Sequence, residues 1–170
     1  MLTIGTDSYI TLEGAAAYLE GGLLPQAWTG AEAATREAAL REAYRALDCV
    51  PGWQGVPYLA SQAGQWPRVQ VFDENGLAYR CGDPADPASY PLPLQQAQCE
   101  EALERLRLAA DAGYLPALAD RAKGIVDRRS SEGAEVRYAA SPRYAGLVSA
   151  RAYALIRPLL LQACTGVAGL

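Results

Sequence analysis

The sequence of 170 residues contains no histidine, the commonest general base and the commonest metal ligand in proteins. Serine–histidine and cysteine–histidine catalysis are therefore excluded. Neither GxxxxGK[ST] nor GxGxxG occurs, so no motif indicates a nucleotide site. We expect a protein that is not an enzyme and that needs no cofactor or metal.

Paired cysteines and long apolar runs are also lacking. The four cysteines form no CxxC motif, which disfavours zinc and dithiol redox sites: Cys49, Cys81, Cys99 and Cys164. We expect reduced, mostly buried thiols, with a disulfide as the alternative. Arg151 and Arg157 interrupt the apolar stretches near the C-terminus, and residues 1–8 show no export signal. We expect a soluble protein with no membrane partner.

Lysine is nearly absent, and the positive charge is unevenly distributed. The formal net charge is −4, and residues 1–90 carry eleven acids against five bases. The stretch from Arg121 to Arg157, here called the basic segment, carries eight bases and three acids. Such a segment on an acidic body indicates an acidic partner or DNA, although a solvated hairpin explains it equally well. The candidate contact residues are Arg121, Lys123, Arg128, Arg129 and Arg137.

Three helices are predicted in the first two thirds of the chain. Thr11 can cap a helix over Leu12–Glu20, which Gly21 and Gly22 end. Thr29 and Glu32 have capping-box spacing before a long amphipathic helix that Pro51 ends. A third helix is expected from Pro93 to Gly113.

The predicted fold is mainly α: a small helical bundle with a long aromatic-rich loop, one β-hairpin, and a C-terminal helix followed by an extended tail. Of the 170 residues, 51% are hydrophobic, and a chain of this length and composition is expected to form one domain over 1–170. Its helical body covers 1–120 and includes the loop 52–92; the hairpin covers 121–140. A final helix opening at Ser141 and Pro142, with an uncharged tail, covers 141–170.

Three further groups of side chains are candidates for binding or chemistry. The loop interleaves rings with guanidiniums, which could stack nucleobases, but a hydrophobic cover over the helices is favoured: Trp53, Tyr58, Trp66, Arg68, Tyr79 and Arg80. The neighbouring carboxylates Glu100, Glu101 and Glu104 are expected on a solvated helix face. Asp83 and Asp86 each precede a proline, which is ordinary turn chemistry.

Several short motifs together resemble a known family. They are Asp7-Ser8-Tyr9-Ile10-Thr11, Trp28, Ala39 to Asp48, Gln65-Trp66-Pro67-Arg68, Pro93 to Glu100, and Leu155-Ile156-Arg157-Pro158-Leu159-Leu160. In order and spacing the chain resembles the head-tail connector (adaptor, head-completion) proteins of long-tailed bacteriophages. Some relatives in that group are labelled DnaT-like single-stranded DNA-binding proteins. The stretch Val69–Tyr90 and the basic hairpin depart from the family pattern.

The resemblance implies a structural virion protein of the phage neck, assembled in the host cytoplasm. It implies a ring, of twelve copies, between the portal and a tail-side neck or tail terminator protein, with genomic duplex DNA passing through its channel. The portal-docking residues implied are Arg157, Pro158, Leu159, Leu160, Leu161, Val167 and Leu170. The alternative function is single-stranded DNA binding.

Overall fold

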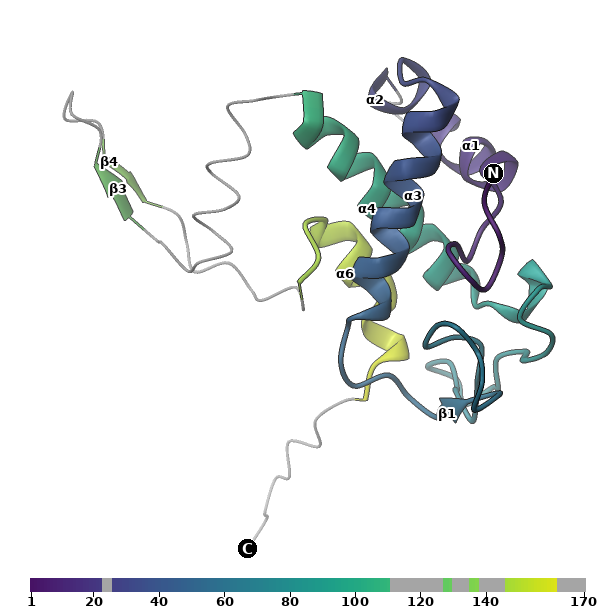
Figure 1. Ribbon diagram of the computed structural model, residues 1–170. Coiled ribbons are helices and arrows are strands. Elements are labelled where there is room, and N and C mark those ends of the chain that lie inside the picture. The colour runs from purple at the N-terminus through teal and green to yellow at the C-terminus, as the bar shows by residue number, and fades with distance from the viewer. Residues whose placement is uncertain (23–25, 111–126, 130–134, 138–145, 162–170) are drawn as a thin grey trace, which may run out of the picture.

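A central helix organises the molecule. The structure is a computed structural model that describes residues 1–22, 26–110, 127–129, 135–137 and 146–161. Around α4 (Leu92–Ala110) lie the four other α-helices of the described residues, each in contact with it: α1 (Leu12–Glu20), α2 (Gln26–Thr29), α3 (Ala33–Asp48) and α6 (Ala150–Ile156) (Figure 1). The prediction of a mainly helical protein with a β-hairpin is confirmed.

The start of α1 agrees with the N-cap that the sequence predicts at Thr11. The Thr11 Oγ1 atom accepts a hydrogen bond of 3.0 Å from the Gly14 amide, and the helix ends before Gly21. This cap satisfies one of the amide groups that every helix leaves unpaired at its first turn.

The predicted capping box of Thr29 and Glu32 is wrong. Thr29 is the last residue of α2, a short helix whose Trp28 is wholly buried. An N-cap residue needs an extended backbone, so a helical Thr29 cannot cap α3. Glu32 itself is the N-cap residue of α3 and makes no side-chain cap bond.

The final helix begins later than the sequence suggests. Residues 146–149 are not helical, and Gly146 has a φ of +90°. The helix α6 starts at Ala150, where the Ser149 Oγ atom accepts a hydrogen bond of 3.2 Å from the Ala152 amide. A 3-10 turn, η2 (Arg157–Leu159), follows it. Ser141 and Pro142, the expected start, lie outside the described residues.

Two strand pairs are present in the part of the chain that the structure describes. The expected hairpin pairs β3 (Asp127–Arg129) with β4 (Glu135–Arg137). A second, unpredicted hairpin pairs β1 (Val56–Pro57) with β2 (Arg68–Val69), inside the long connection between α3 and α4. That connection also holds a 3-10 turn, η1 (Pro87–Ser89), so it is an ordered part of the fold.

The core has two parts, one at each end of α3. One joins α1, α2, α3 and α4 and includes Trp28, Leu40 and Leu103. The other joins α3, α4 and α6 to the connection; it includes Leu47 and Leu159. Within the described residues, no helix is long and apolar enough to cross a bilayer.

Candidate functional site

The C-terminal segment, Arg157–Leu161, is held against the connection between α3 and α4. Trp53 and Leu160 form an antiparallel β-bridge. The Gln54 amide donates to the Leu159 carbonyl (3.0 Å), and the Leu161 amide donates to the Gly52 carbonyl (2.6 Å). The structure therefore brings together two regions that the sequence had singled out separately, the implied docking segment and the aromatic loop.

Both polar atoms of the Gln54 side-chain amide make hydrogen bonds beside this β-bridge. Its Nε2 group donates to the Pro158 carbonyl at 2.8 Å, while its Oε1 atom accepts from the Phe72 amide at 3.3 Å. One amide side chain thus connects the C-terminal segment to the turn that follows β2. A glutamine suits this position because it offers donors and an acceptor together.

The residues implied to dock on a portal differ in their accessibility. Leu159 is wholly buried in this chain's own core, and Leu160 is half-buried. Arg157 and Pro158 are exposed, and Leu161 is 66% exposed. Val167 and Leu170 lie outside the described residues. A partner approaching this segment would meet Arg157, Pro158 and Leu161 rather than Leu159.

Half of the aromatic and guanidinium set in the connection is buried: Trp53, Trp66 and Arg68. The Trp53 and Trp66 rings pack edge to face with centroids 5.4 Å apart, and both are nearly inaccessible. The Arg68 guanidinium donates to the Gln54 and Gly55 carbonyls, each at 2.7 Å, and burial lowers its pKa. These three residues form the hydrophobic and hydrogen-bonded cover that the sequence favoured over base stacking.

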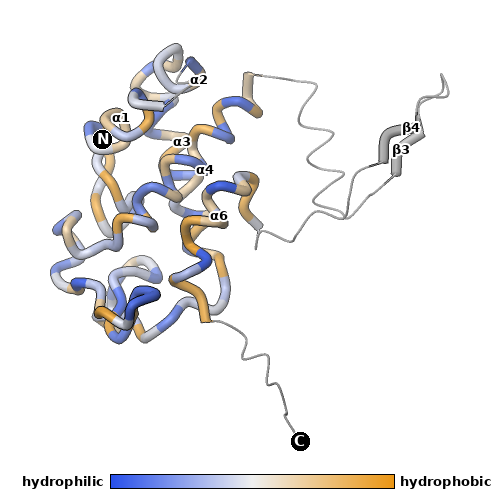
Figure 2. The backbone as a smooth tube through the Cα atoms, turned by 180° about the vertical axis from the view of Figure 1, so that it is seen from behind, coloured by the Kyte–Doolittle hydropathy of each residue, from blue (hydrophilic) through white to orange (hydrophobic). Residues whose placement is uncertain are grey.

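The connection nevertheless presents apolar side chains to solvent. Five of them, here called the loop face, are between 43% and 67% exposed: Val56, Tyr58, Leu59, Phe72 and Leu77. Figure 2 shows hydrophobic stretches among hydrophilic ones in this region and along the C-terminal segment beside it. Exposed apolar side chains gathered on one ordered loop are typical of a contact surface.

The basic residues of the hairpin have a defined backbone register. Arg128 lies opposite Val136, Arg129 opposite Glu135, and Arg137 opposite Asp127. Arg121 and Lys123 lie outside the described residues.

The described residues outside the β3–β4 hairpin have a negative net charge. Residues 1–22, 26–110 and 146–161 contain fourteen acids and nine arginines, a net charge of −5. A phosphate backbone is repelled by such a surface unless a local cluster of cations offsets it. The cations available for that purpose are concentrated in the basic segment.

The expectation that Glu100 and Glu101 lie on a solvated helix face is wrong. Glu101 is wholly buried and Glu100 is 8% exposed. The Glu101 carboxylate accepts hydrogen bonds from the Val148 amide (3.1 Å) and the Ser149 amide (2.9 Å), and pairs with Arg105 at 3.0 Å. Glu101 therefore holds the residues that precede α6 against α4.

Glu100 makes a second connection from the same turn of α4. It accepts a hydrogen bond from the Tyr18 hydroxyl of α1 at 2.9 Å and pairs with Arg151 of α6 at 3.2 Å. Burial, followed by this hydrogen bond, raises the pKa of Tyr18 to about 12. The sequence did contain a signal for burial at 101, since that position follows Leu94 by seven residues and Ala97 by four, on one helical face.

Gln98, one turn earlier on α4, connects the helix to the N-terminal segment. Its Oε1 atom accepts from the Tyr9 amide at 2.8 Å, and its Nε2 group donates to the Ser8 hydroxyl and the Leu40 carbonyl, each at 2.9 Å. All the polar groups of this buried side chain are thus satisfied, as a closed interior requires.

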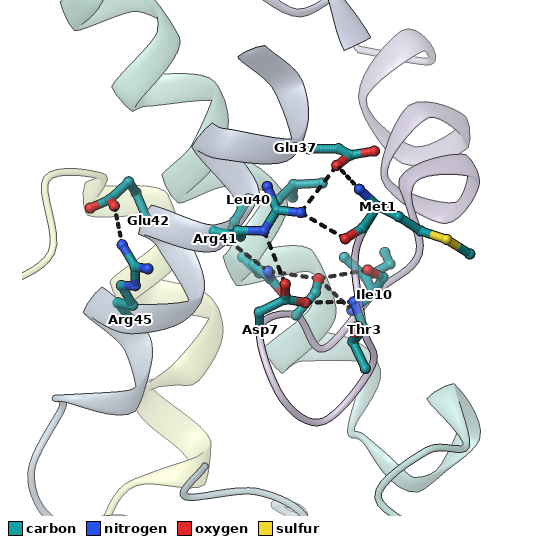
Figure 3. A network of polar contacts seen from close by, with 11 residues as sticks. Met1, Thr3, Asp7, Ile10, Glu37, Leu40, Arg41, Glu42 and Arg45 are labelled. Atoms are coloured by element: carbon teal, nitrogen blue, oxygen red, sulfur yellow. Dashed lines mark hydrogen bonds and ion pairs between the residues drawn. The ribbon is translucent and has the colours of Figure 1, made fainter. Parts of the chain in front are cut away.

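A surface network attaches the same N-terminal segment to α3. The Arg41 guanidinium donates to Asp7 (2.9 Å), to the Met1 carbonyl (2.7 Å) and to Glu37 (3.1 Å) (Figure 3). The hydrogen bond that Arg41 donates to the Asp7 carboxylate is the main reason why the pKa of Arg41 is raised. These contacts fix the segment structurally; they provide no nucleophile or metal site. In the described residues, no group of three potential ligands could hold a metal ion.

Fold and surface together define a small α-helical protein whose long connection covers the core and carries an exposed apolar face. The comparison with family models then identifies the family: residues 2–169 match the one described as "Putative DnaT-like ssDNA binding protein", and the chain belongs to it. No curated protein and no solved structure matches the chain.

Proposed function

We propose that this protein binds single-stranded DNA and performs no catalytic step. The observation that carries the proposal is the family match over residues 2–169, whose description names single-stranded DNA. The same activity was the alternative considered from the sequence. A binding role also agrees with a sequence that has no histidine and no nucleotide motif.

The contact is assigned to the basic segment, with Arg128 and Arg129 of β3 as its principal cations. The described residues outside the hairpin, Arg151 and Arg157 included, carry a net charge of −5, while residues 121–145 carry six bases and three acids, a net charge of +3. Base stacking, where it contributes, would come from Tyr58 and Phe72, which are 43% and 45% exposed, because Trp53 and Trp66 are buried.

The test measures fluorescence anisotropy of a labelled oligo(dT) in increasing salt. Affinity should fall steeply with salt, because cations of the protein replace counterions on the phosphates. Arg128→Glu with Arg129→Glu should raise the Kd by about tenfold or more at moderate salt, since each lost phosphate contact weakens binding.

A matched charge reversal on the body serves as the control. Arg45 and Arg80 are exposed and pair with Glu42 and Asp86. Arg45→Glu with Arg80→Glu changes the net charge equally and should alter the Kd by less than about threefold, because salt screens distant charges. Equal effects of the two double variants, or no binding of the oligonucleotide, would contradict the proposal.

A second candidate is a ring subunit of a phage neck, contacting a portal protein and a tail-side neck protein. Its specific support is the loop face together with Leu161: six exposed apolar side chains beside an acidic body suit protein contact better than phosphate contact. Duplex DNA would then pass the basic segment without sequence-specific contacts.

Co-sedimentation with portal rings encoded beside the gene tests this second candidate. The full chain should sediment with the rings, and a chain ending at Leu161 should not. The truncation must spare Leu159, which is buried in the core, so that a loss of binding is not a loss of folding. If neither chain sediments with portal rings, the neck assignment fails.

A further inference from the structure

We propose that the loop face is a docking surface for the last nine residues, 162–170, of a second copy of this chain. The inference concerns assembly and goes beyond the proposed function: a docked tail would cover Tyr58 and Phe72, and the basic segment would then be the DNA contact of an assembled copy. It rests on the exposure of the loop face, on the course of the C-terminal segment, and on the length and composition of the chain beyond Leu161.

The five side chains of the loop face belong to two adjoining pieces of ordered backbone. Val56 and Tyr58 are two residues apart on β1 and just after it, so they point to the same side. Phe72 and Leu77 belong to one turn, in which Phe72 bridges Ala78 and the Asp73 amide donates to the Leu77 carbonyl at 2.9 Å.

These two pieces are connected through Gln54 and the β1–β2 pairing. Val56 pairs with Val69, three residues before Phe72, and the Phe72 amide is bound to the Gln54 side chain. The apolar side chains thus stand on a fixed framework, which keeps low the conformational entropy that docking would cost.

The direction of the C-terminal segment at Leu161, the last described residue, favours a neighbouring copy over the loop face of the same copy. Leu160 lies opposite Trp53 in an antiparallel bridge, and Leu161 is bonded to Gly52. From Leu160 to Leu161 the chain runs from Trp53 to Gly52, towards the start of the connection. The chain therefore leaves the bridge heading away from Val56 and Phe72 of its own copy.

The segment beyond Leu161 has the chemistry and the length to reach a neighbour. Residues 162–170 carry no charged side chain and include Val167 and Leu170. Nine extended residues span up to about 30 Å, roughly the diameter of a small domain. An apolar, uncharged strand is the natural occupant of an apolar face, because both lose water on contact.

Such a contact is heterologous: residues 162–170 of one copy bind the loop face of the next copy. Repeated contacts of this kind close into a ring or continue as a filament. The proposed contact thus supplies a rule for assembly that uses two different surfaces of each copy.

The first experiment compares the full chain with one that ends at Leu161, by sedimentation velocity over a range of concentrations. The full chain should show concentration-dependent association, and the shortened chain should remain monomeric while its far-ultraviolet circular dichroism is unchanged. Identical mass distributions for the two folded chains would overturn the proposal.

The second experiment uses Cys164 as a natural probe. In a background of Cys49→Ser and Cys81→Ser, one tagged copy carries Leu77→Cys with Cys164→Ser, and its untagged partner keeps Cys164. Oxidation should join the two copies by a disulfide at least about fivefold more efficiently than in a control with Ala34→Cys on exposed α3, because docking raises the effective concentration.

Equal crosslinking of Leu77→Cys and Ala34→Cys would overturn the proposal. So would a chain carrying both Leu77→Cys and Cys164 whose disulfide forms only within one copy at every dilution. That second outcome would assign the loop face to the tail of the same molecule.

Discussion

At the scale of single residues, Glu101 supplies the hydrogen-bond acceptor for two backbone amides, the part-buried one of Val148 and the buried one of Ser149. Its carboxylate bonds to the Val148 and Ser149 amides and pairs with Arg105, and no part of the residue is exposed. Charged acceptors make hydrogen bonds roughly twice as strong as neutral ones. The beginning of α6 is therefore held by a single side chain of α4.

Glu101→Gln should lower the free energy of unfolding by about 2 to 3 kcal/mol, since it removes a charge-assisted acceptor and turns an amide group towards buried amides. Urea denaturation gives the value. The control is Glu42→Gln, an exposed partner of Arg45 that should change stability by less than about 0.5 kcal/mol. Similar losses in both variants would show that Glu101 has no special structural role.

Single residues also show which buried positions a sequence pattern predicts and which it does not. Leu40, Tyr44 and Leu47 follow a helical period and are buried, as expected for one face of the predicted amphipathic helix. Glu101 shares a helical face with Leu94 and Ala97, yet a carboxylate at that position becomes acceptable only because residues 148 and 149, far along the chain, bring two donors. A local sequence pattern cannot predict hydrogen-bond partners that come from a distant part of the chain.

At the scale of elements, the helix starts differ in what holds them. The Thr11 hydroxyl caps α1, whereas Glu32 occupies the equivalent position of α3 without a side-chain bond. The tertiary contacts of α3, including the burial of Leu40 and Leu47, are sufficient for its formation.

Thr11→Ala should therefore cost about 1 kcal/mol, the usual loss for a bonded N-cap. Glu32→Ala should leave stability nearly unchanged, because no cap bond is lost. Thermal or urea unfolding of the two variants side by side measures the difference. A larger loss for Glu32→Ala than for Thr11→Ala would contradict this account of the two helix starts.

The elements were predictable to the extent that their signals were local. Thr11, Gly21 and Gly22 predicted α1 correctly, and the hairpin expected within residues 121–140 is the β3–β4 pair. The helix α2 and the β1–β2 pair were missed, since each is only one turn or two residues long and depends on packing of Trp28 and Trp66. The docking and DNA-contact residues remain predictions.

At the scale of the whole molecule, three tyrosines join segments that are far apart in sequence. The Tyr9 ring lies 4.6 Å from Tyr44 and 5.2 Å from Tyr90, centroid to centroid. The Tyr9 hydroxyl donates to Asp48, and that of Tyr90 donates to the Pro84 carbonyl at 2.6 Å. The cluster connects the N-terminal segment, α3 and the loop.

Burial raises the pKa of all three tyrosines, that of Tyr44 to about 12. In the unfolded chain tyrosines ionise near pH 10, so above this pH the unfolded state loses protons that the folded state keeps. Stability should be full below about pH 10 and fall progressively as the pH rises towards 12, by up to about 1.4 kcal/mol per pH unit for each protonated tyrosine.

Urea midpoints measured at pH 9, 10 and 11 check this expectation, and Tyr44→Phe is the matched variant. It should flatten the decline above pH 10, because one of the linked protons has been removed. An unchanged slope in Tyr44→Phe would mean that other groups cause the alkaline loss.

The central position of α4 has a consequence for how the protein can vary during evolution. Gln98, Glu100 and Glu101 each bind a different element, through Ser8, Tyr18 and Ser149. A mutation that alters one of these three residues leaves an unmatched group elsewhere in the protein. Over evolutionary time, the residues at these positions and those of their partners should therefore change in step, and each lineage should preserve one compatible set.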